Sequence, residues 1–192
     1  MVVNSLKGRM RRIMLEKRNS LSLAAINTKS AAIQRRFAHS DEFNYARILA
    51  SYYPVGSEVR TQKIVRIALK SNRLVALPRT VGDHIKFYQI LSNTDLIPGK
   101  FGIREPSISI DSSDYCVSDN IDLLLVPGIV FDTNGYRIGY GYGYYDRFIA
   151  RKKNSIVSVG LAYEFQVCEK VPRSNGDQKI NVLVTEKRML YF

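Results

Sequence analysis

Three alternating glycines form the segment of this sequence best suited to binding a phosphate. They lie in the stretch Arg137, Ile138, Gly139, Tyr140, Gly141, Tyr142, Gly143, Tyr144 and Tyr145, just before an expected helix over residues 144–153. Such a loop presents backbone N–H groups with no Cβ in the way, and the helix N-terminus adds partial positive charge. Arg137 and Arg147 could add mobile positive charge. The pattern favours an anion site, although a tight turn carrying surface tyrosines explains it equally well.

This loop matches neither of the common nucleotide-binding motifs. Walker A requires Lys and then Ser or Thr after its last glycine, where this chain has Tyr144 and Tyr145. The dinucleotide motif needs Gly-x-Gly-x-x-Gly directly after a strand, whereas the spacing here is Gly-x-Gly-x-Gly. The loop by itself therefore does not identify the anion.

Several carboxylates stand where they could serve the same site. Asp146, in the first turn of the helix after the loop, is a candidate Mg²⁺ ligand, and Asp177, before an expected strand, is a second. Glu58 follows a strand end and opens an expected helix, where it could accept hydrogen bonds from the amino groups of a heterocycle. Glu105 is a similar candidate. Each also has a structural explanation, as a favourable helix-start charge or a turn residue.

The first expected helix, residues 6–18, combines an apolar stripe with a basic face. Lys7 and Arg11 lie four residues apart on one face and could clamp a triphosphate, although basic faces usually only contact solvent. The formal net charge of the chain is +12, which implies an anionic partner. That partner is either nucleic acid or a multiply charged small molecule.

Alternating strands and helices must position these residues. We expect strands over residues 47–53, 73–77, 84–90, 121–126, 156–162 and 180–184, and further helices over residues 58–69 and from Ser20 or Ser22 to Phe37. Residues 91–120 show no convincing period and are expected to be mostly loop. The strand–helix–strand spacing of residues 47–77 predicts parallel strands. The chain is therefore expected to form one α/β domain over residues 1–192.

The composition argues against several classes of protein. No apolar run approaches the roughly 18–20 residues of a membrane span, and the N-terminal segment lacks the apolar region of a secretory signal. The two histidines, His39 and His84, and the two cysteines, Cys116 and Cys168, form no zinc motif, and a Gly-x-Ser-x-Gly nucleophile motif is missing from the sequence. We expect a cytoplasmic protein with reduced thiols and no membrane partner.

The order of motifs closely resembles the 5-formyltetrahydrofolate cyclo-ligase family, also called methenyltetrahydrofolate synthetase. The resemblance is strongest at residues 122–132, which include Val-Pro-Gly, and at residues 135–147, which include Gly-Tyr-Tyr-Asp-Arg. It extends over nearly the whole chain, through Lys7, Arg11, Glu58, Thr61, Leu77, Pro78, Phe87, residues 102–106, Gln166, Pro172, Asp177 and residues 184–186.

The resemblance implies a three-layer α/β domain with a mainly parallel open sheet, and an enzyme that makes 5,10-methenyltetrahydrofolate from 5-formyltetrahydrofolate with Mg²⁺ and ATP. The ATP γ-phosphoryl group would activate the formyl oxygen, and N10 would close the ring with release of ADP and phosphate. Lys7, Arg11 and the loop from Arg137 to Tyr145 would bind ATP. Arg137, Tyr145 and Asp146 would act in catalysis, Asp146 and Asp177 would bind Mg²⁺, and Tyr53, Glu58, Phe87 and Glu105 would contact the folate.

Three positions depart from the family pattern. Tyr142 stands where the family often has Gly or Lys, and Gly176 and Asn181 replace residues that flank Asp177 in the family. A diverged member without this turnover is therefore one alternative. A nucleic-acid-binding protein that stacks bases on the tyrosine-rich loop is another, but it explains the charge and not the order of motifs. The sequence predicts no oligomeric state.

Overall fold

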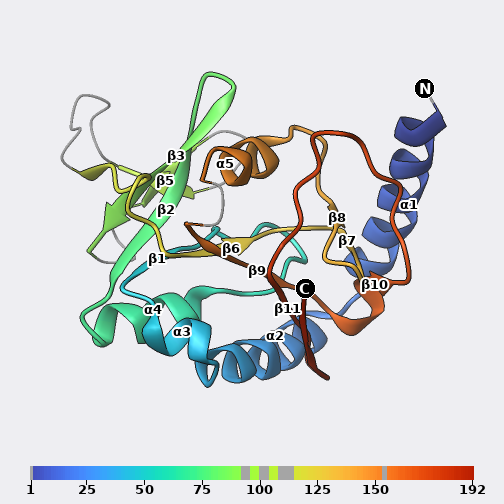
Figure 1. The fold of residues 1–192 in the computed structure, drawn as a ribbon. Helices are drawn as coiled ribbons and strands as arrows, with labels where there is room; N and C mark the ends of the chain where they lie inside the picture. The colour runs from blue at the N-terminus through green and yellow to red at the C-terminus, as the bar shows by residue number, and fades with distance from the viewer. Residues whose placement is uncertain (1, 92–95, 100–103, 108–114, 153–154) are drawn as a thin grey trace.

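A seven-stranded sheet forms the centre of the molecule (Figure 1). The computed structural model describes residues 2–91, 96–99, 104–107, 115–152 and 155–192. The strand order is β12-β11-β9-β6-β1-β2-β3, with β1 (Ile48–Ala50), β2 (Leu74–Val81), β3 (His84–Ile90), β6 (Leu123–Val126), β9 (Val157–Leu161), β11 (Val182–Val184) and β12 (Met189–Tyr191). The five central strands are parallel, and β3 and β12 run antiparallel at the two edges. The predicted mainly parallel sheet is confirmed.

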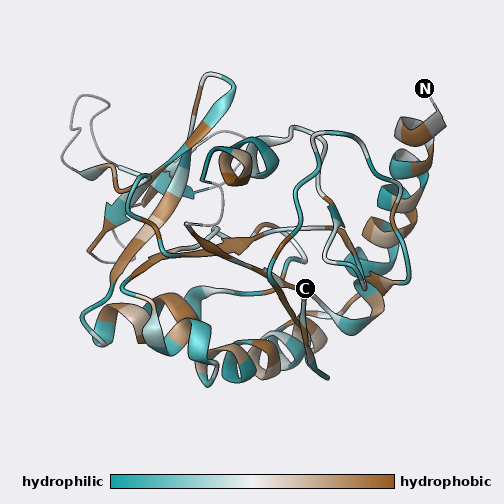
Figure 2. Cartoon of the chain, in the orientation of Figure 1, coloured by the Kyte–Doolittle hydropathy of each residue, from teal (hydrophilic) through white to brown (hydrophobic). Residues whose placement is uncertain are grey.

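Helices cover both faces of this sheet, as the three-layer prediction requires. α2 (Leu23–Ala38), α3 (Asp41–Tyr45) and α4 (Gln62–Lys70) lie on one face, and α5 (Tyr144–Lys152) lies on the other (Figure 1). Phe37 and Ile64 pack with one set of buried strand residues, and Phe148 packs with Leu124 and others of the opposite set. The central strands β6, β9 and β11 are mostly hydrophobic (Figure 2), because both of their faces are covered.

The first helix lies to one side of the sheet rather than in a layer. α1 (Val2–Asn19) runs beside a small sheet with the strand order β10 (Val167–Cys168), β7 (Val130–Asp132) and β8 (Arg137–Ile138) (Figure 1). Met10 and Met14 of α1 pack against Ile129, Val130 and Ile138 there. No helix in the described part of the chain is long and apolar enough to cross a membrane. The predicted N-terminal helix is therefore docked against the segment that precedes the glycine-rich loop.

The helix after β1 begins at Gln62, so the prediction that it opens at Glu58 is wrong. The preceding residues form a turn, in which the Tyr52 hydroxyl donates to the Val59 carbonyl at 2.9 Å. The Gln34 side chain of α2 accepts hydrogen bonds from the first backbone N–H groups of α4. These donors are free only where a helix starts, so a partner from another helix fixes the start of α4. Glu58 thus lies in a turn and not at a helix N-terminus.

Other differences concern strands. β1 ends at Ala50 rather than at residue 53, because the chain turns away from the sheet after Ser51. β2 continues through Pro78, which pairs with β3 but lies beyond the last residue of β2 that pairs with β1. The N–H that proline lacks is therefore not needed for a hydrogen bond to β1. β4 (Leu96–Pro98) and β5 (Arg104–Pro106) pair within the segment predicted as mostly loop. Positions 92–95, 100–103 and 108–114 of the predicted loop lie outside the described residues. The small sheet and β12 were not predicted.

Candidate functional site

A cavity of about 740 Å³ opens at the carboxyl ends of β1 and β6. The chain leaves β1 towards β2 and leaves β6 towards β9, on opposite sides, so the cavity lies at the switch point where ligands bind in open α/β sheets. Its lining residues come from segments far apart in sequence: Lys7, Arg11, Tyr52, Tyr53, Val55, Glu58, Pro78, Thr80, Ile85, Glu105, Pro127, every residue from Arg137 to Asp146, Ser174 and Asp177.

The fold brings all but one of the predicted site residues to this cavity. Phe87 is the exception, because its side chain is completely buried and does not line the cavity. Its ring packs edge-on against Tyr145, with centroids 6.4 Å apart, and against Phe148 at 4.9 Å. Phe87 therefore packs against Tyr145 from inside the protein, and its side chain does not line the cavity where a ligand could touch it.

The glycine-rich segment forms the connection between β8 and α5. Gly141 has φ +108° and Gly143 has φ +68°, which is the left-handed region that side chains disfavour. The Arg11 Nε donates to the Gly139 carbonyl at 2.8 Å, and this bond ties α1 to the loop. The helix N-terminus that follows adds positive potential. The local arrangement is consistent with the predicted anion-binding loop.

Arg137 and Asp146 form a largely buried ion pair between β8 and α5. The Arg137 Nη1 lies 3.3 Å from the Asp146 Oδ1, and the exposed fractions of their side chains are 3% and 28%. The Gln178 backbone joins both, because its carbonyl accepts from Arg137 and its N–H donates to the Asp146 carboxylate. Burial lowers the pKa of Arg137, while the charge of Asp146 opposes that shift. The pair fixes a cation and an anion in the cavity wall.

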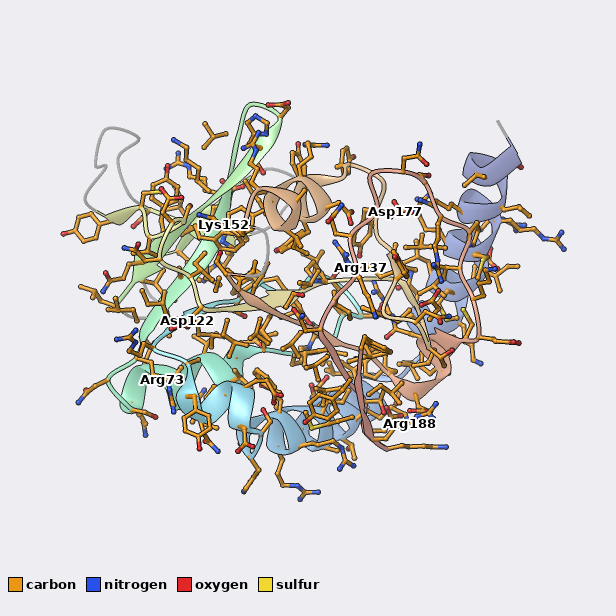
Figure 3. All side chains as sticks on the ribbon, in the orientation of Figure 1. Arg73, Asp122, Arg137, Lys152, Asp177 and Arg188 are labelled. Atoms are coloured by element: carbon orange, nitrogen blue, oxygen red, sulfur yellow. The ribbon has the colours of Figure 1, made fainter. Side chains whose placement is uncertain are left out.

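Asp177 is held from the opposite end of the chain. The Lys7 Nζ lies 2.5 Å from the Asp177 Oδ2 and donates to the Ser174 Oγ at 3.0 Å. The Ser174 backbone N–H donates to the same carboxylate oxygen at 2.7 Å. In Figure 3, Asp177 and Arg137 lie on neighbouring segments on the side of the molecule that carries α1. The two predicted Mg²⁺ ligands thus line one cavity.

These two carboxylates fit a Mg²⁺ ion that is shared with a phosphate-bearing ligand. The contacts described for Asp146 use Oδ1 and those for Asp177 use Oδ2, so each carboxylate has a second oxygen. Among the described residues, no group of three or more His, Cys, Asp or Glu could enclose a metal. Mg²⁺ commonly binds one or two carboxylates and completes its coordination with phosphate oxygens and water.

Glu58 is anchored in the cavity wall by hydrogen bonds to both of its carboxylate oxygens. Its Oε2 accepts from the Val55 N–H at 2.9 Å, and its Oε1 accepts from the Tyr140 hydroxyl at 3.1 Å. The Arg18 Nη2 donates to the same hydroxyl at 2.9 Å. Burial raises the pKa of Glu58, while the Val55 hydrogen bond and the Arg18 charge oppose that shift. A buried carboxylate with fixed orientation is suited to accept hydrogen bonds from a heterocycle.

Sequence reasoning did not single out Arg18. This residue is 2% exposed, although it belongs to a helix face predicted to be solvated. Lys7, Arg11 and Arg18 are separated by four and seven residues, which places all three on one face of α1. That spacing was the sequence signal that could have identified Arg18 as a site residue. The lining residues Tyr52, Val55, Pro78, Thr80, Ile85, Pro127 and Ser174 were also missed, and most of them flank the carboxyl ends of β1, β2 and β6.

Tyr145 and Tyr53 complete the polar lining. Burial raises the pKa of Tyr145, and the nearby Glu58 charge acts in the same direction. The Tyr145 phenol therefore stays protonated at neutral pH and can donate a hydrogen bond. Tyr53 is half-buried and follows directly after Tyr52, which is buried.

The positions that depart from the family pattern differ in their relation to the cavity. The Asn181 Oδ1 accepts from both the backbone N–H and the hydroxyl of Ser158, each at 2.8 Å, so it links β11 to β9. Gly176 lies in the turn before Asp177, and a Cβ there would meet no atom within 4 Å. Neither residue lines the cavity, whereas Tyr142 does and stacks on Tyr144.

Comparisons with known proteins agree with each other. The model of the 5-formyltetrahydrofolate cyclo-ligase family matches residues 3–186. A probable 5-formyltetrahydrofolate cyclo-ligase of Schizosaccharomyces pombe is 28% identical over 200 residues, which cover 96% of this chain and 97% of that protein. The 5-formyltetrahydrofolate cyclo-ligase of Haemophilus influenzae is 30% identical over 140 residues, covering 71% of this chain and 74% of that protein.

A solved structure is similar over almost the whole chain. The 5,10-methenyltetrahydrofolate synthetase of Aquifex aeolicus superposes with a TM-score of 0.85 at 36% identity, covering 97% of this chain and 92% of that one. Sequence and fold therefore lead to the same assignment. This chain belongs to the 5-formyltetrahydrofolate cyclo-ligase family of enzymes.

Proposed function

We propose that this chain converts 5-formyltetrahydrofolate to 5,10-methenyltetrahydrofolate, with Mg²⁺ and ATP, and releases ADP and phosphate. The observation that carries the proposal is the composition of one cavity. Lys7, Arg11 and Arg137 line it together with the glycine-rich loop, and Glu58 and Glu105 line it as well. A single space thus offers cations for a polyphosphate and carboxylates for a heterocycle.

The basic part of the cavity suits the triphosphate of ATP. Lys7 and Arg11 reach it from α1, and Arg137 reaches it from β8. The loop glycines allow a phosphate to approach the backbone, and the N-terminus of α5 favours negative charge. Asp146 and Asp177 would hold Mg²⁺, which when bound would neutralise phosphate charge and orient the γ-phosphoryl group.

The remaining part of the cavity suits the pterin of the folate. Val55, Pro78, Ile85 and Pro127 give it an apolar lining. Glu58 offers an anchored carboxylate, and a bound heterocycle that donates to it through amino groups would be held in one orientation. Few polar groups in a largely apolar pocket are the usual basis of orientation and specificity.

The reaction follows from the weakness of a formamide oxygen as a leaving group. That oxygen attacks the γ-phosphorus of ATP, a new P–O bond forms, and the bond to ADP breaks. The N5 lone pair stabilises the product as an iminium phosphate. N10 then attacks the activated carbon and loses its proton, and the C–O bond breaks to release phosphate and leave the methenyl bridge. No protein nucleophile is required, so catalysis depends on positioning and on charge neutralisation.

The chain supplies these effects through groups with fixed positions. Arg137 is oriented by Asp146 and by the Gln178 carbonyl, so its charge needs no reorganisation during phosphoryl transfer. The protonated Tyr145 hydroxyl is available as a hydrogen-bond donor in the same cavity. The α1 contacts to Gly139 and Asp177 hold Arg11 and Lys7 in the cavity wall before a ligand arrives.

A spectrophotometric assay tests this proposal. The methenyl product has its own near-ultraviolet absorbance band, so purified protein is mixed with 5-formyltetrahydrofolate, with and without ATP and with and without Mg²⁺. We expect product only when both ATP and Mg²⁺ are present. A flat trace from folded protein that binds Mg²⁺-ATP would contradict the proposal and favour a diverged member of the family.

A further inference from the structure

A chain of three polar side chains connects α1, the glycine-rich loop and the turn after β1. The Arg18 Nη2 donates to the Tyr140 hydroxyl at 2.9 Å, and that hydroxyl donates to the Glu58 Oε1 at 3.1 Å. Tyr140 stands between Gly139 and Gly141, in the segment assigned above to ATP, whereas Glu58 is assigned to the folate. The hydroxyl of Tyr140 therefore links a residue of the proposed ATP-binding loop directly to a residue of the proposed folate site.

The direction of both hydrogen bonds is fixed by chemistry. A guanidinium can only donate, and an ionised carboxylate can only accept. The Tyr140 hydroxyl must therefore accept from Arg18 and donate to Glu58, and a rotation that breaks either bond leaves a buried charged group without that partner. Arg18 and Glu58 are 2% and 6% exposed, so such a loss is costly.

Arg18 has three described hydrogen-bond partners, one of which is the Tyr140 hydroxyl. Its other partners are the Ser57 Oγ at 3.1 Å and the Gly128 carbonyl at 3.4 Å, which are both neutral. None of the carboxylates in the described part of the chain comes within 4 Å of its nitrogens. Its charge acts on Glu58 through space, and the Tyr140 hydroxyl, which becomes a stronger donor when a cation polarises it, is a hydrogen-bonded connection between the two groups.

The position of the loop and the orientation of Glu58 are consequently linked. Glycines on both sides of Tyr140 leave the loop backbone many accessible conformations, so side-chain contacts help to hold its shape, and the bond from Tyr140 to Glu58 is such a contact. A nucleotide that orders the loop keeps the Tyr140 hydroxyl on the Glu58 Oε1. The Glu58 carboxylate is then fixed by Tyr140 on one oxygen and by the Val55 N–H on the other. Lone pairs remain on both oxygens for a ligand.

We propose that Tyr140 is a positioning residue that, together with Arg18, couples nucleotide binding at the glycine-rich loop to folate binding at Glu58. The inference rests on the proposed function, because it assigns ATP and the folate to these two ends of the cavity. The coupling is positive: each ligand fixes the Tyr140–Glu58 hydrogen bond that the other one requires. Thermodynamic reciprocity demands that the nucleotide tightens folate binding by the same factor as the folate tightens nucleotide binding.

Isothermal titration calorimetry measures the coupling directly. A non-hydrolysable ATP analogue with Mg²⁺ is titrated into the full chain, alone and with saturating 5-formyltetrahydrofolate. We expect the wild-type protein to bind the analogue at least about 5-fold tighter when the folate is present. Tyr140→Phe keeps the ring and removes the linking hydroxyl, and we expect the factor to fall below about 2-fold, since most of the coupling passes through this bond.

Tyr144→Phe is the matched control. Tyr144 also lines the cavity, but the contacts described for it use its ring, which stacks on Tyr142 and lies beneath the Arg147 guanidinium. The coupling factor should stay at the wild-type value in this variant. A loss of coupling in both variants would overturn the assignment to Tyr140, because it would be a general effect of removing a hydroxyl from the cavity.

A double-mutant cycle tests the role of Arg18. Arg18→Met removes the donor to Tyr140, and its coupling factor should fall as it does in Tyr140→Phe. The double variant should lose no more than either single variant, because both changes break one chain of contacts. Additive losses would contradict the shared path, and thermal unfolding shows that each variant is folded.

The outcomes for the coupling and for the catalytic proposal can be told apart. Equal coupling in the wild-type protein and Tyr140→Phe, or negative coupling in the wild-type protein, would overturn this inference even if methenyl product forms normally. A wild-type protein that neither binds the folate nor forms product would overturn the proposed function, and this inference with it.

Discussion

Asp146→Asn separates the role of this carboxylate in the fold from its role in catalysis. At the 3.3 Å separation of Arg137 and Asp146, the gross Coulomb attraction is about 5 kcal/mol for an effective dielectric constant of about 20. Breaking a buried pair typically costs 3–5 kcal/mol. Because the Asp146 side chain is 28% exposed and Asn can still accept from the Gln178 N–H, we expect a smaller loss, about 2–3 kcal/mol. For a chain of this size that lowers Tm by about 4–12 °C, so the variant stays folded at 25 °C.

The same substitution should have a much larger effect on turnover. Asn keeps one oxygen but removes the negative charge that is proposed to hold Mg²⁺, so we expect kcat/KM to fall at least about 100-fold. The methenyl absorbance assay, repeated over a range of Mg²⁺ concentrations, measures this loss. Asp119→Asn is the control, because Asp119 is an exposed residue that pairs with Lys152 away from the cavity, and it should leave activity unchanged. Activity of folded Asp146→Asn within about threefold of wild type would refute the metal assignment.

Three further predictions follow from the same geometry. Burial raises the pKa of Glu58, so folate affinity should fall as the pH drops through this raised pKa, because protonation removes the carboxylate charge. Calorimetry on Glu58→Gln should show weaker folate binding that does not change over the same pH range. Gly141→Ala forces a side chain into φ +108°, at a cost of about 1–3 kcal/mol, and should raise KM for ATP clearly more than Gly139→Ala. At Gly139, φ is not positive and an added Cβ would meet no atom within 4 Å, so equal effects of the two variants would contradict a role for the loop shape. Phe87→Ala should lower the free energy of unfolding by about 3–5 kcal/mol in denaturant titrations, because its ring is completely buried. Phe87→Leu should stay folded, and because Phe87 packs against Tyr145 it should lower kcat more than it raises KM for the folate.

The sequence was most informative where a local pattern has one physical explanation. Residues 123–126 are apolar throughout because β6 is buried on both faces, and this run predicted a buried parallel strand. Glycines that alternate just before a helix predicted the loop at the cavity, since the positive φ values of Gly141 and Gly143 leave few other residue types. Ser22, one of the two serines predicted as the possible N-cap of this helix, caps α2 by accepting a hydrogen bond from the Ala25 N–H.

Contacts between distant segments could not be predicted in this way. Whether a helix starts at Glu58 or Gln62 depends on Gln34, which belongs to another helix. Arg18 shares its residue type with exposed positions on α1, so apart from its spacing from Lys7 and Arg11 only its contacts in the folded chain distinguish it. The pairing of β4 with β5 is a contact between short segments that have no local period of their own. The site residues were predicted from the resemblance to a family, because members with the same motifs in the same order share a fold and therefore the contacts between distant segments.

The central claim is that the formyl oxygen is phosphorylated by ATP before the ring closes. Substrate labelled with ¹⁸O in the formyl group tests this claim most directly, because the mechanism breaks the C–O bond after the P–O bond has formed. Mass spectrometry of the phosphate released by the wild-type protein should then find one ¹⁸O atom per phosphate, in step with methenyl formation. Unlabelled phosphate, with the ¹⁸O found in water, would contradict phosphoryl transfer to the formyl oxygen and require a different role for ATP.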